Sequence, residues 1–163
     1  MIMDIKTNWK SIKSHFKNSL KRNMFLAIAS VNDQNEPTVT PIGSLFFNEN
    51  QTGFYFEKFA TKLNKHAKTN NKICVIAVNN SKWFWLISLF KGKFSSYPGV
   101  KLYGELGESR EATEIEKRAM QRRVRITQGL KGHTYLWKDM SLVRDIKFTK
   151  AEKINLGQMT REL

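Results

Sequence analysis

The sequence predicts a mainly β fold of the α+β class, in which a small antiparallel β-barrel carries an N-terminal helix and further peripheral helices. Two observations lead to this fold class. Apolar segments of strand length follow each other closely with turn-rich segments between them, and only two or three stretches repeat with helical period. The chain has 163 residues, the length of one domain, and 40% of them are hydrophobic. We therefore predict a single domain over residues 1–163 with a sizeable core.

Residues 1–22 are predicted to form the N-terminal helix. Their apolar residues recur at helical spacing with lysines between them, and these are Ile5, Trp9, Ile12, Phe16 and Leu20. An apolar stripe of this kind packs a helix against its own domain. A basic helix with such a stripe could also lie on an anionic membrane surface. We expect the first arrangement and no membrane partner.

Residues 24–109 are predicted to supply the barrel strands, and the first three strands are expected to form a meander. These three strands are Phe25–Val31, Thr38–Phe47 and Phe54–Lys58. The segments between them are polar and rich in Asn, and the middle strand is interrupted by Pro41 and Gly43. Because short turns connect antiparallel neighbours, each strand is expected to pair with the next one.

The second half of the chain continues with short elements. They are a helix in Ala60–Asn70, strands at Ile73–Val78 and Val100–Gly107, a helix over 111–126, and closing strands Leu142–Thr149 and Lys153–Leu156 within 142–157. The helix over 111–126 begins with a capping box formed by Thr113 and Glu116. Cys74 lies within an apolar strand and is predicted to be a buried core thiol.

The aromatic run Trp83–Phe90 is too rich in aromatic residues to fit entirely into the core of so small a barrel. At least one of Trp83, Phe84 and Trp85 is expected to face a dimer partner or to stack near a ligand. The run is much shorter than a membrane span, and the N-terminus lacks the apolar segment of a signal peptide. We therefore expect a cytoplasmic protein.

The usual enzymatic motifs are missing from the sequence. It contains no HExxH, GxSxG, Walker or GxGxxG motif, and its single cysteine precludes an internal disulfide or a CxxC pair. His15, His66 and His133 fall in different predicted elements, so no metal site is expected. No side chain is assigned as a catalyst, and any redox chemistry would require a cofactor.

The net charge of +14, from 28 Lys and Arg against 14 Asp and Glu, raises the possibility of a nucleic-acid partner. The cations are spread over four stretches of the chain, and no nucleic-acid-binding motif accompanies them. We therefore expect no such partner and interpret part of the charge as solvated surface. The alternative is a basic module that binds nucleic acid or an anionic surface and has an empty barrel.

One segment combines a strand end with a helix start. Glu57 and Lys58 come at the end of a predicted strand, and Thr61 and Lys62 begin a predicted helix. A hydroxyl group, an ammonium group and free backbone N–H groups at a helix N-terminus form a site of the size of a phosphate. The segment is therefore a candidate anion site.

The succession FLAIASVNDQNEPTVTPIGSLFFNENQTGFYFEKFATKLNKHAKTNNKICVIAV resembles the core of the pyridoxamine 5′-phosphate oxidase-like, FMN-binding split-barrel family. The resemblance rests on the order and spacing of a strand, a turn ending in Pro, a second strand with Pro, an aromatic third strand and a Thr-Lys helix start. It covers residues 24–80 well, and the later strands are similar in kind. It implies a six-stranded antiparallel split β-barrel and a homodimer with FMN at its interface.

The resemblance also implies which residues contact the flavin. They are Thr40, Pro41, Ile42, Gly43, Ser44, Phe56, Glu57, Lys58, Thr61 and Lys62. The first five would line the isoalloxazine ring, largely through backbone groups, and the missing side chain of Gly43 would permit the close approach of a planar ring. Phe56 and Glu57 would lie beside the flavin and its ribityl chain. Thr61 and Lys62 would hold the phosphate, with Lys58 as a candidate for a further contact.

Two departures separate the chain from the true pyridoxamine phosphate oxidases. Those enzymes have arginines at the positions of Thr40 and Thr61, and their C-terminal Arg-x-His signature is not evident here. The resemblance therefore implies another subgroup, an FMN-dependent oxidoreductase that acts on an unidentified small molecule or accepts electrons from a nicotinamide donor. A flavin-binding stress or sensor protein with little turnover is the alternative.

Overall fold

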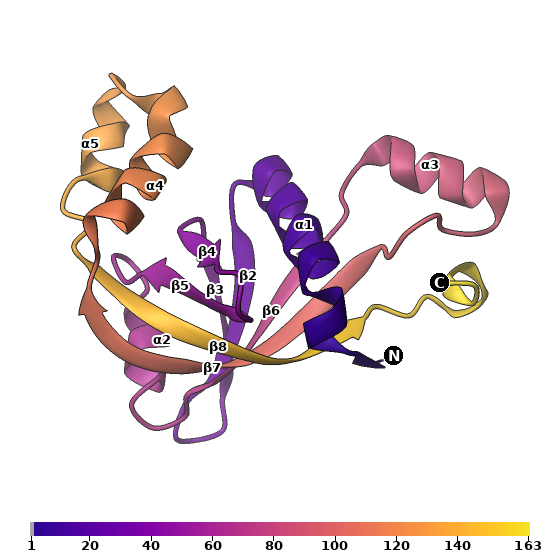
Figure 1. Cartoon of the computed structure of the whole chain (residues 1–163), viewed down its shortest axis with the longest axis horizontal. Helices are drawn as coiled ribbons and strands as arrows, with labels where there is room; N and C mark the ends of the chain where they lie inside the picture. Colours follow the sequence, from indigo (N-terminus) through magenta and orange to yellow (C-terminus); the bar gives the residue numbers. More distant parts are fainter. Residues whose placement is uncertain (1) are drawn as a thin grey trace.

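The computed structural model describes residues 2–163, and these form one antiparallel sheet curled into a half-barrel with helices around it (Figure 1). The strands are β1 (Ile2–Met3), β2 (Leu26–Val31), β3 (Pro37–Ile42), β4 (Leu45–Phe47), β5 (Thr52–Phe56), β6 (Lys72–Val78), β7 (Gly99–Glu111) and β8 (Leu142–Lys153). Their order in the sheet is β3-β2-β6-β7-β8-β5-β4, with β1 paired to β8. The predicted fold class is confirmed, although the described residues form eight strands rather than six.

The described part of the chain also contains five α-helices. They are α1 (Ile5–Asn23), α2 (Thr61–His66), α3 (Lys82–Lys91), α4 (Glu114–Val124) and α5 (Lys131–Trp137), with short 3₁₀ helices at Arg125–Thr127 and Gly157–Thr160. The predicted N-terminal helix is confirmed as α1. Its residues Trp9, Ile12 and Phe16 are buried in the main core, which they share with strand residues such as Ile28 and Phe148.

The meander predicted for the first three strands is wrong at its centre. β2 pairs with β3 and β4 pairs with β5, but β3 and β4 lie at opposite ends of the strand order. The reason lies in β3, which contains Pro37 and Pro41. Because proline has no N–H group to donate to a second neighbour, such a strand suits a sheet edge. The chain therefore leaves the first hairpin at Gly43 and Ser44 and begins the other edge.

The two closing strands predicted within 142–157 are one continuous strand, β8. The residues predicted to separate them are paired with β7, with Lys150 opposite Tyr103 and Ala151 opposite Leu102. Ala151 is fully buried between the partly exposed Lys150 and Glu152. The polar residues of this segment are therefore the outward positions of an alternating strand, and not a turn.

Cys74 is half-buried and is not part of the core, so this prediction is wrong. In β6 the side chains of Ile73, Val75 and Ala77 face the core. Successive side chains of a strand point to opposite faces, and Cys74 therefore lies on the other face, opposite Tyr103 of β7. A continuous apolar run conceals this alternation in the sequence.

The aromatic run Trp83–Phe90 belongs to α3, which projects away from the sheet in Figure 1. Ser88 is the buried residue of this helix, whereas Trp83 is 74% exposed and Phe90 is 94% exposed. The loop after α3 returns Phe94 to stack on Phe84. Phe94 also meets the Trp85 ring edge-to-face, and apart from these contacts α3 presents most of its apolar surface to the surroundings.

Helix α4 begins with the predicted capping box. The Thr113 side chain accepts a hydrogen bond from the N–H of Glu116, and the Glu116 carboxylate accepts one from the N–H of Thr113. α4 and α5 lie together at one end of the molecule (Figure 1). A second apolar cluster joins α4 to the sheet, and its buried members are Phe54, Phe56, Ala112, Met120, Val124 and Val143.

Candidate functional site

The predicted cofactor residues lie in three segments of the fold. Residues 40–44 end β3 and form the bend before β4, residues 56–58 end β5, and residues 61–62 begin α2. The Ser44 hydroxyl group donates a hydrogen bond to the carbonyl oxygen of Phe56 at 3.3 Å. The first two segments therefore lie side by side, and the turn from Glu57 to Ala60 connects them directly to α2.

The segment 40–44 is only partly accessible. Thr40 is half-buried and Pro41 is exposed, whereas Ile42 and Ser44 are buried. A Cβ atom at Gly43 would lie 2.9 Å from the carbonyl oxygen of Met24. Glycine is therefore required here by the close approach of the chain before β2, independently of any ligand.

Arg123 of α4 holds this segment in place, and the sequence analysis missed it. Its Nη1 atom donates to the carbonyl oxygens of Gly43 at 2.9 Å and Leu45 at 2.7 Å, and its guanidinium group lies over the Phe46 ring, 3.5 Å from the ring centroid. Burial lowers the pKa of Arg123 to about 10, so the group remains protonated at neutral pH. Nothing in the sequence distinguishes Arg123 from the adjacent exposed Arg122.

The side chains of Phe56 and Glu57 already have partners within the chain. Phe56 is fully buried in the second apolar cluster. The Glu57 carboxylate accepts hydrogen bonds from Nε of Arg144 and from the hydroxyl group of Ser109, both at 2.7 Å. Any contact of these two residues with a ligand would therefore be made by their backbone.

The Lys58 side chain bonds to α5 and the residue that follows it, and not to α2. Its ammonium group donates to the carbonyl oxygen of Tyr135 at 3.3 Å and also to that of Lys138. Lys58 thus links the end of β5 to α5 and the residue that follows it. The structure does not bring it together with Thr61 and Lys62.

The start of α2 has unused hydrogen-bond donors. Ala60 at the N-cap provides no side-chain acceptor, and no acceptor within residues 2–163 takes the N–H groups of Thr61, Lys62 or Leu63. The side chains of Thr61 and Lys62 are exposed and form no hydrogen bond or ion pair with described residues. Free N–H groups, a hydroxyl group and an ammonium group are therefore available at one helix start, where a phosphate could bind.

These three segments fit FMN in part. The donors at α2 match a terminal phosphate, and the exposed Pro41 and the half-buried Gly43 offer uncharged surface at the end of β3. The side chains of Phe56, Glu57 and Lys58 do not contribute to this fit, since they are buried or bonded elsewhere. The donor set at α2 is the part of the prediction that the geometry favours most.

The described residues provide neither a metal site nor a membrane-spanning helix. Within residues 2–163, no cluster of three or more His, Cys, Asp or Glu side chains is arranged to hold a metal ion. The three histidines lie apart, and each is hydrogen-bonded: His15 to the Ala77 carbonyl oxygen, His66 to Ser30 and His133 to Thr127. None of the helices in the described range is both long and apolar enough to cross a bilayer.

Comparison with solved structures identifies the fold. An FMN-binding protein from Syntrophomonas wolfei superposes with a TM-score of 0.61 at 15% identity, over 94% of this chain and 96% of its own. A Clostridium acetobutylicum protein of the pyridoxinephosphate oxidase family, related to general stress protein 26 of B. subtilis, gives 0.50 at 16% identity, over 93% and 91%. HutZ, the heme storage protein from Vibrio cholerae, gives 0.52 at 10% identity, over 93% and 95%.

These similarities extend over nearly the whole chain but are low in sequence identity. No protein-family model matches the chain, and no curated protein sequence does. At 10% to 16% identity, the likeness establishes the fold and leaves the ligand open. The chain therefore has the split-barrel fold of FMN-binding and pyridoxamine 5′-phosphate oxidase-like proteins, as its sequence resemblance implies.

Proposed function

We propose that this protein binds FMN and acts as an FMN-dependent oxidoreductase on a small molecule. The observation that carries the proposal is the start of α2, where three N–H groups, the Thr61 hydroxyl group and the Lys62 ammonium group have no acceptor within the described residues. This donor set would hold the phosphate of FMN. The position of α2 shortly after β5, whose last residue bonds to Ser44, supports the assignment.

The rest of the site would act through its backbone. Residues 41–44 would lie along the isoalloxazine ring, held in position by Arg123 and by the hydrogen bond between Ser44 and Phe56. Thr40 would border the ring at the end of β3. A bound flavin supplies hydride or electron transfer at its ring, so no side chain of the chain itself is required as a covalent catalyst.

The charge of the protein favours an anionic reaction partner. A net charge of +14 raises the local concentration of anions and favours negative charge within the site. An anionic small molecule or a phosphate-bearing nicotinamide donor would therefore be the expected substrate. A flavin-binding sensor with little turnover would have the same site and would differ only in its rate of reduction.

The proposal includes a homodimer with the flavin at its interface. The exposed apolar side chains of α3 support this, because a large apolar surface on a basic, charged protein is commonly covered by a partner. The members of this surface are Trp83, Leu86, Ile87, Leu89 and Phe90.

The phosphate assignment can be tested by comparing FMN with riboflavin, which lacks the phosphate. Titration of the flavin-free protein, followed by quenching of flavin fluorescence, is expected to give an affinity at least about tenfold higher for FMN. Equal affinities would remove the α2 start from the site. Steady-state oxidation of reduced nicotinamides by the FMN-loaded protein then separates turnover from binding, since a sensor would hold FMN tightly and be reduced slowly.

A further inference from the structure

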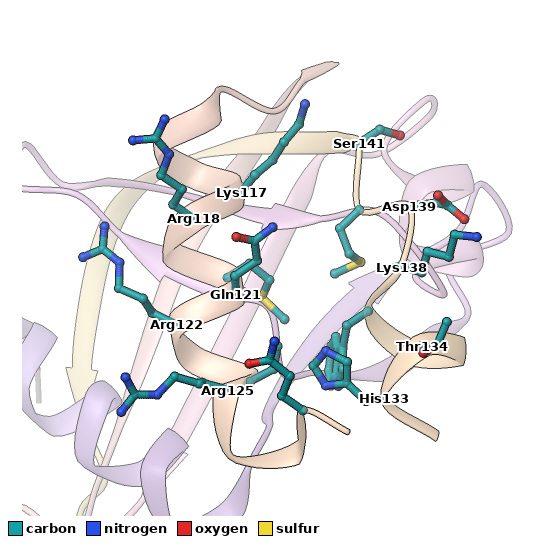
Figure 2. Close-up of a pocket in the computed structure, with 15 residues that line it drawn as sticks. Lys117, Arg118, Gln121, Arg122, Arg125, His133, Thr134, Lys138, Asp139 and Ser141 are labelled. Carbon is teal, nitrogen blue, oxygen red and sulfur yellow. The ribbon is translucent and has the colours of Figure 1, made fainter. Parts of the chain in front are cut away.

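A pocket of about 870 Å³ lies between α4 and α5, and none of the sequence-predicted site residues lines it (Figure 2). Its two walls are α4 and α5, and the segment from Lys138 to Ser141 that leads into β8 closes one side. This volume is in the range of small-molecule sites in proteins. The pocket is therefore large enough for a ligand of several fused rings.

The interior of the pocket is apolar. Met120 is 2% exposed and Val124 is 8% exposed, and Trp137 and Met140 pack against the cluster that these two residues belong to. Thioether groups and an indole ring make favourable contacts with the faces and edges of aromatic rings. An aromatic ring is thus the group that this interior suits best.

Polar groups border the same space from both helices. Gln121 extends from α4 and His133 from α5 into the region between the helices, as Figure 2 shows. His133 is hydrogen-bonded to Thr127 through Nδ1 at 2.9 Å, and neither its Nε2 atom nor the Gln121 amide group has a partner within residues 2–163. These groups can orient the edge of a bound ring by hydrogen bonding.

The charge around the pocket is strongly positive. Five cationic side chains line it, and Asp139 is the single acidic residue in the lining. The cationic residues are Lys117, Arg118, Arg122, Arg125 and Lys138. Only Lys117 is engaged in an ion pair among the described residues, with Glu114 at 3.0 Å. In Figure 2 the three guanidinium groups extend from the side of α4 that points away from α5, so they add positive charge near the pocket without reaching into it.

We propose that the pocket between α4 and α5 binds an aromatic anion, a compound with a planar ring system and a carboxylate or phosphate group. The ring would contact Trp137 and the two methionines, and the anionic group would lie at the basic rim. Binding of this compound does not require a flavin.

The pocket is also linked to the segments assigned to the flavin. Arg123, in the helix that forms one wall, bonds to the carbonyl oxygens of Gly43 and Leu45, and Lys58 bonds to those of Tyr135 and Lys138 in the opposite wall. If the proposed function holds, an aromatic anion bound in this pocket would act as the substrate or an effector of the flavin site. This role in the reaction, unlike binding itself, rests on the proposed function.

The test uses naphthalene-2-carboxylate as the probe and naphthalene-2-methanol as its neutral counterpart, both titrated into the purified full chain by calorimetry. We expect the carboxylate to bind at least about fivefold more tightly than the alcohol. Similar affinities for the two compounds, or no binding of the carboxylate, would overturn the proposal.

Two matched pairs of variants locate the binding. Gln121→Trp fills the pocket from an exposed position, and its control is Ile115→Trp, also on α4 but outside the lining. Lys138→Glu reverses one charge in the lining, and its control is Lys131→Glu at the start of α5, outside the lining. The pocket variants are expected to weaken carboxylate binding about tenfold and about fivefold, and the controls less than about twofold. Equal effects within either pair would place the binding elsewhere.

The visible spectrum of each sample distinguishes this inference from the proposed function. A protein that takes up no flavin but binds naphthalene-2-carboxylate with the expected variant pattern retains the pocket assignment and loses the flavin assignment. A protein that retains FMN but fails the variant pattern loses the pocket assignment alone.

Discussion

Arg123 shows how a single side chain can couple a peripheral helix to the bend before β4. Its guanidinium group reaches from α4 to the carbonyl oxygens of Gly43 and Leu45. The same group stacks on Phe46, so its charge is compensated by carbonyl dipoles and an aromatic face instead of a carboxylate. The bend before β4 therefore depends on a residue about eighty positions away.

Replacing Arg123 by alanine is expected to destabilise the fold by about 2 to 3 kcal/mol, because two carbonyl groups lose their donor and a packed side chain is removed. Denaturant unfolding monitored by circular dichroism measures the change. The matched variant Arg122→Ala, at the exposed neighbouring position, is expected to change stability by less than about 0.5 kcal/mol. Equal effects in the two variants would mean that Arg123 does not hold the bend.

Lys62→Ala tests the phosphate contact directly. Loss of the ammonium group at the start of α2 is expected to weaken FMN binding about tenfold or more, since a charge-assisted hydrogen bond to the phosphate is removed. Lys65→Ala, in the last turn of the same helix, serves as the control and is expected to leave FMN affinity nearly unchanged. An unaltered affinity in Lys62→Ala would show that the phosphate lies elsewhere.

Cys74 is expected to be a slow nucleophile in spite of its partial exposure. Burial raises the pKa of its thiol above the ordinary value, so little thiolate is present at pH 8. Alkylation by iodoacetamide should therefore be at least about tenfold slower in the folded protein than in guanidinium chloride, as measured by mass spectrometry. Equal rates would indicate an accessible, ionised thiol.

At the scale of elements, the start of α4 joins the helix to the sheet. The Glu116 carboxylate closes the capping box and also pairs with Arg110, whose guanidinium group bonds to Asp145 of β8. The hydrogen bond from Arg110 is the main cause of a lowered pKa at Glu116, below the ordinary value of 4.5, and the bonds from Thr113 lower it further. A carboxyl group with a lowered pKa stabilises the fold above its unfolded pKa, and this contribution is lost as the pH falls through the folded pKa.

Glu116→Gln should therefore lower the free energy of unfolding by about 1 kcal/mol at pH 7, and the difference from the unaltered protein should shrink as the pH falls below about 4. Urea unfolding at a series of pH values measures this. Glu108 is exposed and forms no ion pair with the described residues, so the control variant Glu108→Gln should show no such pH dependence. A difference that stays constant down to pH 2 would contradict the assigned ion pair.

Most elements of the fold could be predicted from local pattern, whereas their pairing could not. The stripe of α1, the capping box of α4 and the apolar runs of β2 and β6 are local signals, and each lies within a few residues of its predicted position. Pro37 and Pro41 favour an edge position for β3, but they do not reveal that β4 begins the opposite edge of the sheet. The continuity of β8 depends on the partner strand β7, which keeps Ala151 buried between two polar residues.

The candidate site could be predicted only in outline. Thr61 and Lys62 do lie at a helix start, because that signal is local in the sequence. The partners of Glu57 come from β7 and β8 and those of Lys58 from α5 and the residue after it, all more than fifty residues away, and no local pattern reveals them. Arg123 and the pocket between α4 and α5 were missed for the same reason.

At the scale of the whole molecule, the exposed apolar helix α3 and the high positive charge make opposite contributions to self-association. The apolar side chains of α3 favour contact with a second copy, whereas a charge of +14 on each chain opposes it through repulsion that salt screens. The proposed homodimer should therefore be held by apolar contacts and should become tighter as salt is added.

A double change of Trp83→Ser and Phe90→Ser is expected to weaken dimerisation by at least about tenfold, because both side chains are largely exposed in the single chain. Sedimentation equilibrium at low and high salt gives the dissociation constants. Ile115→Ser, another exposed apolar residue but on α4, is the matched control. The dimer interface would not involve α3 if the unaltered protein is a monomer, or if the double variant and the Ile115→Ser control weaken dimerisation equally.

The central claim, that this split barrel holds FMN, is tested most directly by the visible absorption spectrum of the purified protein. The spectrum is recorded before and after addition of FMN and gel filtration, together with the elution volume. Our account predicts the two visible bands of a flavin, retained at about one per chain on a peak of dimer size. A protein that releases all FMN, whether it remains colourless or shows the Soret band of a haem, would contradict it.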